Sequence, residues 1–107
     1  MDPMDEIRIT FFVECEELLE MLEEGLITIN EGEHDEETVN VVFRAVHSIK
    51  GGAGAFGLDA LVRFAHTFET TLDEIRSGNL AADQDVTSLL LRAADVLSDL
   101  VASSRDG

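Results

Sequence analysis

A histidine, a lysine and three glycines lie within eight residues of one another near the middle of the chain. His47 and Lys50 are followed by Gly51, Gly52 and Gly54. A neutral imidazole is a usable nucleophile near neutral pH, and residues three or four positions apart share one side of a helix. Three glycines in a helix interior cost about 3 kcal/mol relative to alanine. We interpret the segment as an exposed nucleophile beside bare backbone, with room for a phosphoryl group and for the partner that delivers it.

Four stretches of helical periodicity must position these residues. Apolar residues recur at steps of three and four, and no segment of comparable length alternates with period two. The patterns predict helices over residues 4–30, 35–55, 58–77 and 83–103. Short connections between amphipathic helices favour an antiparallel bundle. The predicted fold is therefore all-α, a four-helix bundle with up-down-up-down topology, and residues 1–107 form a single domain.

Apolar stripes along these helices define the predicted core. The first helix contributes Ile7, Phe11, Cys15, Leu18, Leu22, Leu26 and Ile29. The fourth helix contributes Val86, Leu90, Ala93, Leu97 and Leu100. Because Cys15 lies in such a stripe, we expect a buried thiol and not a catalytic one.

Two residues of the first helix flank its core stripe. We expect Ile9 and Phe12 to stay partly exposed and to form, with the glycine face of the second helix, a small apolar patch for a partner. A core position for Phe12 is the alternative. The glycine face consists of Gly51, Gly52 and Gly54.

The charge is strongly acidic and unevenly distributed. Seven basic residues face 23 acidic ones, a net charge of −16, and fourteen of the acidic residues lie within residues 1–37. Such a chain is a poor binder of nucleic acid and is repelled by anionic membranes. The acidic helix is either a solvated face or a guide for basic partners. The N-terminus lacks the cationic region of a signal peptide and no apolar run approaches the roughly 20 residues of a membrane span, so we expect a cytoplasmic location.

The remaining histidines do not suggest a metal site. His47 and His66 fall on different predicted helices, and the single cysteine has no partner for a zinc motif. His34 lies in the acidic linker and is expected to be an ordinary surface residue. No phosphate-binding loop of the G-x-x-x-x-G-K-[ST] type is present either. We therefore expect no bound metal and no bound cofactor.

The segment AVHSIKGGAGAFGLDAL resembles the signature of histidine-phosphotransfer (HPt) domains. Three longer segments, TFFVECEELLEMLEEGL, VFRAVHSIKGGAGAFG and FAHTFETTLDEIRSG, are similar to the N-terminal phosphotransfer domains of chemotaxis histidine kinases of the CheA type. The resemblance covers about residues 5–80 closely and the fourth helix by pattern alone. It implies a helical bundle whose histidine is phosphorylated by the ATP-binding domain of the kinase and then phosphorylates response regulators.

The resemblance also assigns roles to individual residues. His47 is the implied phosphorylated residue and Lys50 the family's lysine, while Glu69 and His66 fall where the family places a glutamate and a second histidine. A carboxylate that accepts the Nδ1–H bond would leave Nε2 free to attack phosphorus, and Glu69 is the candidate for it. Lys50 would offset the charge of the transferred phosphoryl group.

The implied partners are the kinase catalytic domain of the same or another chain and CheY-type response regulators. ATP and Mg²⁺ would come with the kinase domain, and Mg²⁺ again with the receiver. We expect no autonomous catalysis from this domain, although it would be part of a histidine protein kinase. The alternative function is a non-catalytic helical interaction module without phosphate exchange, in which the glycine cluster packs against a partner helix.

Overall fold

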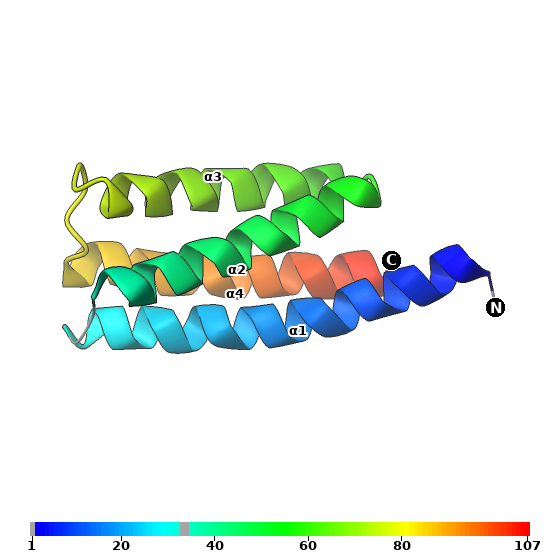
Figure 1. Ribbon diagram of the computed structural model, residues 1–107, viewed down its shortest axis with the longest axis horizontal. Coiled ribbons are helices and arrows are strands. Elements are labelled where there is room, and N and C mark those ends of the chain that lie inside the picture. The colour runs from blue at the N-terminus through cyan, green and yellow to red at the C-terminus, as the bar shows by residue number, and fades with distance from the viewer. Residues whose placement is uncertain (1, 33–34) are drawn as a thin grey trace.

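Four helices make up the computed structural model, which describes residues 2–32 and 35–107. They are α1 (Pro3–Asn30), α2 (Glu36–Ala55), α3 (Asp59–Arg76) and α4 (Gln84–Asp106). Helices α1 and α3 run in one direction and α2 and α4 in the other (Figure 1). Since α1 and α3 each pack against both α2 and α4, the helices close into a ring. This antiparallel four-helix bundle confirms the predicted fold class. His34, which was expected to be a surface residue, lies outside the described residues.

The helix ends follow from local side-chain and backbone chemistry. Asp35 caps α2 by accepting a hydrogen bond from the Thr38 amide at 2.9 Å, and Asp83 caps α4 in the same way. Backbone amides left free at a helix N-terminus favour such acceptors. Gly57 and Gly78 follow α2 and α3 with φ of 66° and 82°, a conformation that glycine adopts without steric cost. The observed bounds lie within one residue of those predicted, except that α4 continues three residues further, to Asp106.

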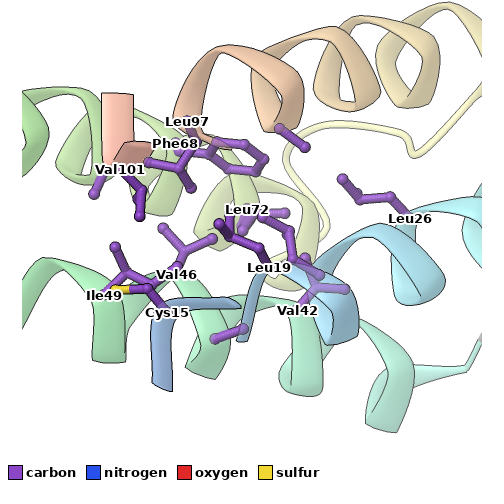
Figure 2. Packing of buried hydrophobic residues seen from close by; sticks show 14 of the residues in the cluster. Cys15, Leu19, Leu26, Val42, Val46, Ile49, Phe68, Leu72, Leu97 and Val101 are labelled. Carbon is purple, nitrogen blue, oxygen red and sulfur yellow. The ribbon is translucent and has the colours of Figure 1, made fainter. Parts of the chain in front are cut away.

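Apolar side chains from all four helices fill the interior of the bundle (Figure 2). On α2, Ala45, Val46 and Ile49 face the core, whereas the His47 side chain is 60% exposed. His47 therefore points away from the interior of the bundle. Among the described helices, none combines the length and the apolar character needed to cross a bilayer.

The buried strip of α1 differs from the predicted one. Phe12 is only 4% exposed, so the expectation that it stays partly exposed is wrong. Leu19 is buried while Leu18 is only partly so, and Ile7 is 55% exposed. The reason is that α1 packs against α2 and α4 on two sides, which widens its buried strip beyond one stripe. The N-terminal end of α1 extends past the other helices (Figure 1).

The buried face of α4 includes Leu90 and Leu97, as predicted, but its other members differ from the predicted stripe. Thr87, Ala94 and Val101 are buried, whereas the predicted Val86, Ala93 and Leu100 are only partly buried. The polar position is tolerated because the Thr87 hydroxyl donates a hydrogen bond to the Asp83 carbonyl oxygen at 2.6 Å. From the sequence pattern, the apolar Val86 was predicted to be the core residue, and not Thr87 next to it.

Two glycines allow α1 and α2 to approach closely. A Cβ atom at Gly25 of α1 would overlap the Val42 side chain, and one at Gly52 of α2 would overlap the Phe11 ring. By contrast, Cβ atoms at Gly51 and Gly54 would meet open space. The three glycines of the predicted docking face thus have different surroundings: Gly52 lies against Phe11 of α1, whereas Gly51 and Gly54 are open. Their role in docking a partner stays a prediction.

These environments predict opposite effects for two glycine-to-alanine changes. Gly25→Ala gains about 1 kcal/mol of helix propensity but forces a methyl group into buried, stiff Val42, which costs about 1–3 kcal/mol. We expect Gly25→Ala to lower the free energy of unfolding and Gly51→Ala to raise it by about 0.5–1 kcal/mol. Urea unfolding followed by circular dichroism measures both. Equal stabilisation by the two changes would contradict the close approach of α1 and α2.

The single thiol lies in the core, as predicted. Cys15 is fully buried, and burial, together with the charge of Glu14, raises the pKa of its thiol to about 12. Since the thiolate is the reactive species, we expect native Cys15 to resist a soluble disulfide reagent at about pH 8. The same reagent should modify it completely in urea, as measured by the released chromophore. Rapid stoichiometric reaction in native buffer would be the opposite result.

Candidate phosphoryl-acceptor site on α2 and α3

His47, Lys50 and Glu69 meet on the outer surface between α2 and α3. His47 and Lys50 come from α2 and Glu69 from α3. The side chains of the three residues are 60%, 23% and 15% exposed, so the imidazole is the part that solvent and partners reach. The structure thus brings together three of the four residues predicted for the site.

One oxygen of Glu69 contacts both α2 side chains. Its Oε2 lies 3.2 Å from Nδ1 of His47 and 2.9 Å from Nζ of Lys50. A carboxylate can only accept hydrogen bonds, so Nδ1 must carry the proton for this contact to be a hydrogen bond. In the neutral imidazole, that tautomer leaves the Nε2 lone pair free. Glu69 therefore orients the ring with Nε2 away from the carboxylate.

The charge of Glu69 is set by competing effects. Burial raises the pKa of the Glu69 carboxyl, but hydrogen bonds from Lys50 and then His47 outweigh it, and the pKa is lowered overall. Glu69 is accordingly an anion at neutral pH. The Lys50 ammonium has three donors, so its contact with Glu69 leaves two for other acceptors. The expected role of Lys50, to offset the charge of a transferred phosphoryl group, stays a prediction; its observed contact is the Glu69 carboxylate.

A second aromatic ring lies beside His47, and the sequence reasoning missed it. The Phe43 ring is nearly parallel to the imidazole, with an interplanar angle of 8° and centroids 6.1 Å apart. The guanidinium carbon of Arg76, from α3, lies 4.0 Å from the Phe43 centroid. Asp73 holds that guanidinium through a hydrogen bond of 2.6 Å. The four-residue spacing of Phe43 and His47 on one helix was the available signal.

Comparison with known proteins assigns a family to this arrangement. The family model of the Hpt domain matches residues 6–105. The chain belongs to the Hpt domain family. It is 64% identical over 104 residues to the chemotaxis protein CheA of Rhizobium meliloti, a match covering 97% of this chain and 14% of that protein. It is 63% identical over 111 residues to CheA of Cereibacter sphaeroides, covering 100% of this chain and 16% of that one. The chain thus spans about one-seventh of the length of these relatives.

A solved structure resembles this Hpt domain closely. It is the phosphorylated P1 domain of CheA3 in complex with CheY6 from R. sphaeroides, at a TM-score of 0.89 and 27% sequence identity. The match covers 95% of this chain and 80% of that one. The four-helix arrangement described above is therefore the fold of a CheA phosphotransfer domain.

His66 does not join the hydrogen-bonded group of this Hpt domain. It is exposed on α3, and its backbone carbonyl accepts a bond from the Thr70 hydroxyl at 2.9 Å. Among the described residues, no hydrogen bond involves its imidazole. The predicted participation of His66 in the network is thus not seen in this structure. Over the same residues, no group of three or more His, Cys, Asp or Glu side chains is arranged to hold a metal ion.

The surface predicted for partner docking is also arranged differently. Ile9 is 53% exposed, as expected, but lies in a groove with Arg8, Phe12 and Val13, between α1 and α4. The groove that includes Gly52 is instead bordered on α1 by Ile7. Ile9 and the glycine segment of this Hpt domain therefore line separate grooves.

Proposed function

We propose that this Hpt domain is a phosphoryl carrier in two-component chemotaxis signalling. His47 accepts a phosphoryl group from the ATP-bound kinase domain of a CheA-like sensor kinase, in the same or another chain, and donates it to an aspartate of CheY-type response regulators. The observation that carries the proposal is the contact of Glu69 with Nδ1, which leaves Nε2 on the exposed side chain as the attacking atom. The similarity to CheA proteins and to a P1 domain solved in complex with CheY6 supports the choice of partners.

The first transfer begins from the neutral imidazole. The Nε2 lone pair attacks the γ-phosphorus of ATP, the N–P bond forms, and the bond to the bridging oxygen breaks so that ADP leaves with its electron pair. Positive charge develops on the ring during attack, and the Glu69 carboxylate next to Nδ1 stabilises it. Lys50 keeps that carboxylate ionised and in place.

The second transfer returns the imidazole to its starting state. A carboxylate oxygen of the receiver aspartate attacks phosphorus, the N–P bond breaks, and its electron pair returns to Nε2. Because the transition state of phosphoryl transfer is loose, positioning and charge supply most of the catalysis. The kinase domain supplies ATP and Mg²⁺ for the first transfer, and the receiver supplies Mg²⁺ for the second. Both transfers take place in the cytoplasm. This domain supplies the oriented imidazole and catalyses no reaction of its own.

Phosphorylation by a kinase core tests this function directly. The chain is incubated with radiolabelled ATP, Mg²⁺ and the kinase core of a similar CheA that lacks its own phosphotransfer domain. We expect label that is lost in acid and kept in base, as for phosphohistidine, and that moves to an added CheY-type receiver. Absence of label would favour a non-catalytic interaction module, and label that survives acid would place the phosphate on another residue type.

A further inference from the structure

We propose that Phe43, covered by Arg76, is a positioning residue that holds the imidazole plane of His47 for phosphoryl transfer. The inference rests on the proposed role of His47 as phosphoryl acceptor. It assigns to α2 and α3 a second set of contacts beside the Glu69–Lys50 pair, one that acts on the face of the imidazole instead of its edge.

The contact with Glu69 leaves the orientation of His47 incomplete. Glu69 touches the imidazole at one atom, Nδ1, at 3.2 Å, and the His47 side chain is 60% exposed. A ring held at one atom can still tilt about that contact, and tilting moves Nε2 away from the line of attack on phosphorus. In-line transfer is sensitive to displacements of about 1 Å. A second contact is therefore needed to define the plane of the ring.

Phe43 lies where it can define that plane. It precedes His47 by one helical turn on α2, and its ring is within 8° of parallel to the imidazole. Phe43 is itself partly buried and packs against the core, so its ring is less mobile than an exposed one. Offset parallel arrangements are among the favoured geometries of aromatic pairs.

Arg76 fixes the Phe43 ring from the neighbouring helix. Its guanidinium carbon lies 4.0 Å from the Phe43 centroid, at the distance of a cation–π contact. The guanidinium donates to Asp73 Oδ1, also on α3, at 2.6 Å. A continuous series of contacts thus runs from Asp73 through Arg76 and Phe43 to His47. It ties the imidazole to α3 at a point different from Glu69.

The role of Phe43 is positional because its ring carries no acid, base or charge for the reaction. Any aromatic ring of similar size should therefore serve, and an aliphatic side chain should not. Phe43→Tyr tests the first expectation and Phe43→Leu the second. Phe64→Leu is a matched control, because Phe64 is also partly buried but lies on α3 in a groove with Leu89 and Ala93.

The experiment combines phosphorylation rates with imidazole dynamics. Initial labelling rates are measured with the kinase core, and ¹³C relaxation of the His47 ring carbons reports its motion in each chain. We expect Phe43→Leu to label about three- to tenfold more slowly than Phe64→Leu and to show a more mobile imidazole. Phe43→Tyr should restore both the rate and the ring order. Urea unfolding checks that the two leucine variants have similar stabilities.

Two results would overturn the inference. One is a Phe43→Leu chain that labels as fast as Phe64→Leu; the other is slower labelling with an imidazole as ordered as in the wild type. If the wild type itself takes no label, the proposed function fails, and the relaxation data still decide whether Phe43 orders the His47 ring.

Discussion

Replacing His47 by glutamine is expected to abolish phosphorylation of the chain by a kinase core with ATP and Mg²⁺. The amide keeps a polar side chain of similar reach but has no nitrogen lone pair that can attack phosphorus. Since the His47 side chain is 60% exposed and outside the core, the variant should fold as the wild type does. Radiolabel retained after the reaction, together with intact-protein mass, measures the effect.

His66→Gln is the matched control for this loss. His66 is the other described histidine, it is exposed on α3, and no hydrogen bond among the described residues involves its imidazole. We expect this variant to keep the label. Equal labelling of His47→Gln and wild type would remove His47 from the mechanism, and loss of label in His66→Gln alone would move the acceptor to α3.

Truncation of Glu69 should slow phosphorylation of His47 by about 10- to 100-fold. Loss of a group that orients a histidine has an effect of that size in metal sites, where a carboxylate often fixes the tautomer. In this site, Glu69→Ala removes the acceptor 3.2 Å from Nδ1 and the partner of Lys50 at once. The ring proton is then free to occupy either nitrogen, and a proton on Nε2 blocks the attacking lone pair. Single-turnover labelling rates measure the loss.

Glu69→Gln separates orientation from charge. Its carbonyl oxygen can still accept the Nδ1–H bond, but it carries no negative charge to stabilise a cationic ring or to hold Lys50. We expect a rate between those of wild type and Glu69→Ala. The ¹⁵N shifts of the imidazole should show the Nδ1–H tautomer retained in Glu69→Gln and diminished in Glu69→Ala. Wild-type rates in both variants would show that the carboxylate has no part in the transfer.

The sequence predicted the helices well because their information is local. Steps of three and four residues, and stops such as Gly57 and Gly78, placed most helix ends within one residue. What failed was the exact buried face of two helices, α1 and α4. The burial of Phe12 and Thr87 depends on which neighbours cover each side of α1 and α4, and periodicity within one helix does not contain that information.

For the site as well, the sequence did not predict contacts that depend on how neighbouring helices pack. The pairing of His47 with Glu69 was predicted through the family resemblance, and the geometry agrees with it. The Arg76–Phe43 contact was not, because it joins positions on two helices whose relative register the sequence does not state. The role expected of Lys50 toward the phosphoryl group stays a prediction. Its contact with Glu69 was not predicted, because it depends on the register of α2 against α3.

Every contact of the site lies within α2 and α3, two helices joined by residues 56–58 alone. The contacts of the site therefore belong to one helical hairpin, α2–α3, and α1 and α4 pack against that hairpin. Substitutions at exposed positions of α1 and α4 therefore leave the contacts of His47 with Glu69 and Phe43 in place. Their effects on partner binding can be measured without a change in the geometry of the imidazole.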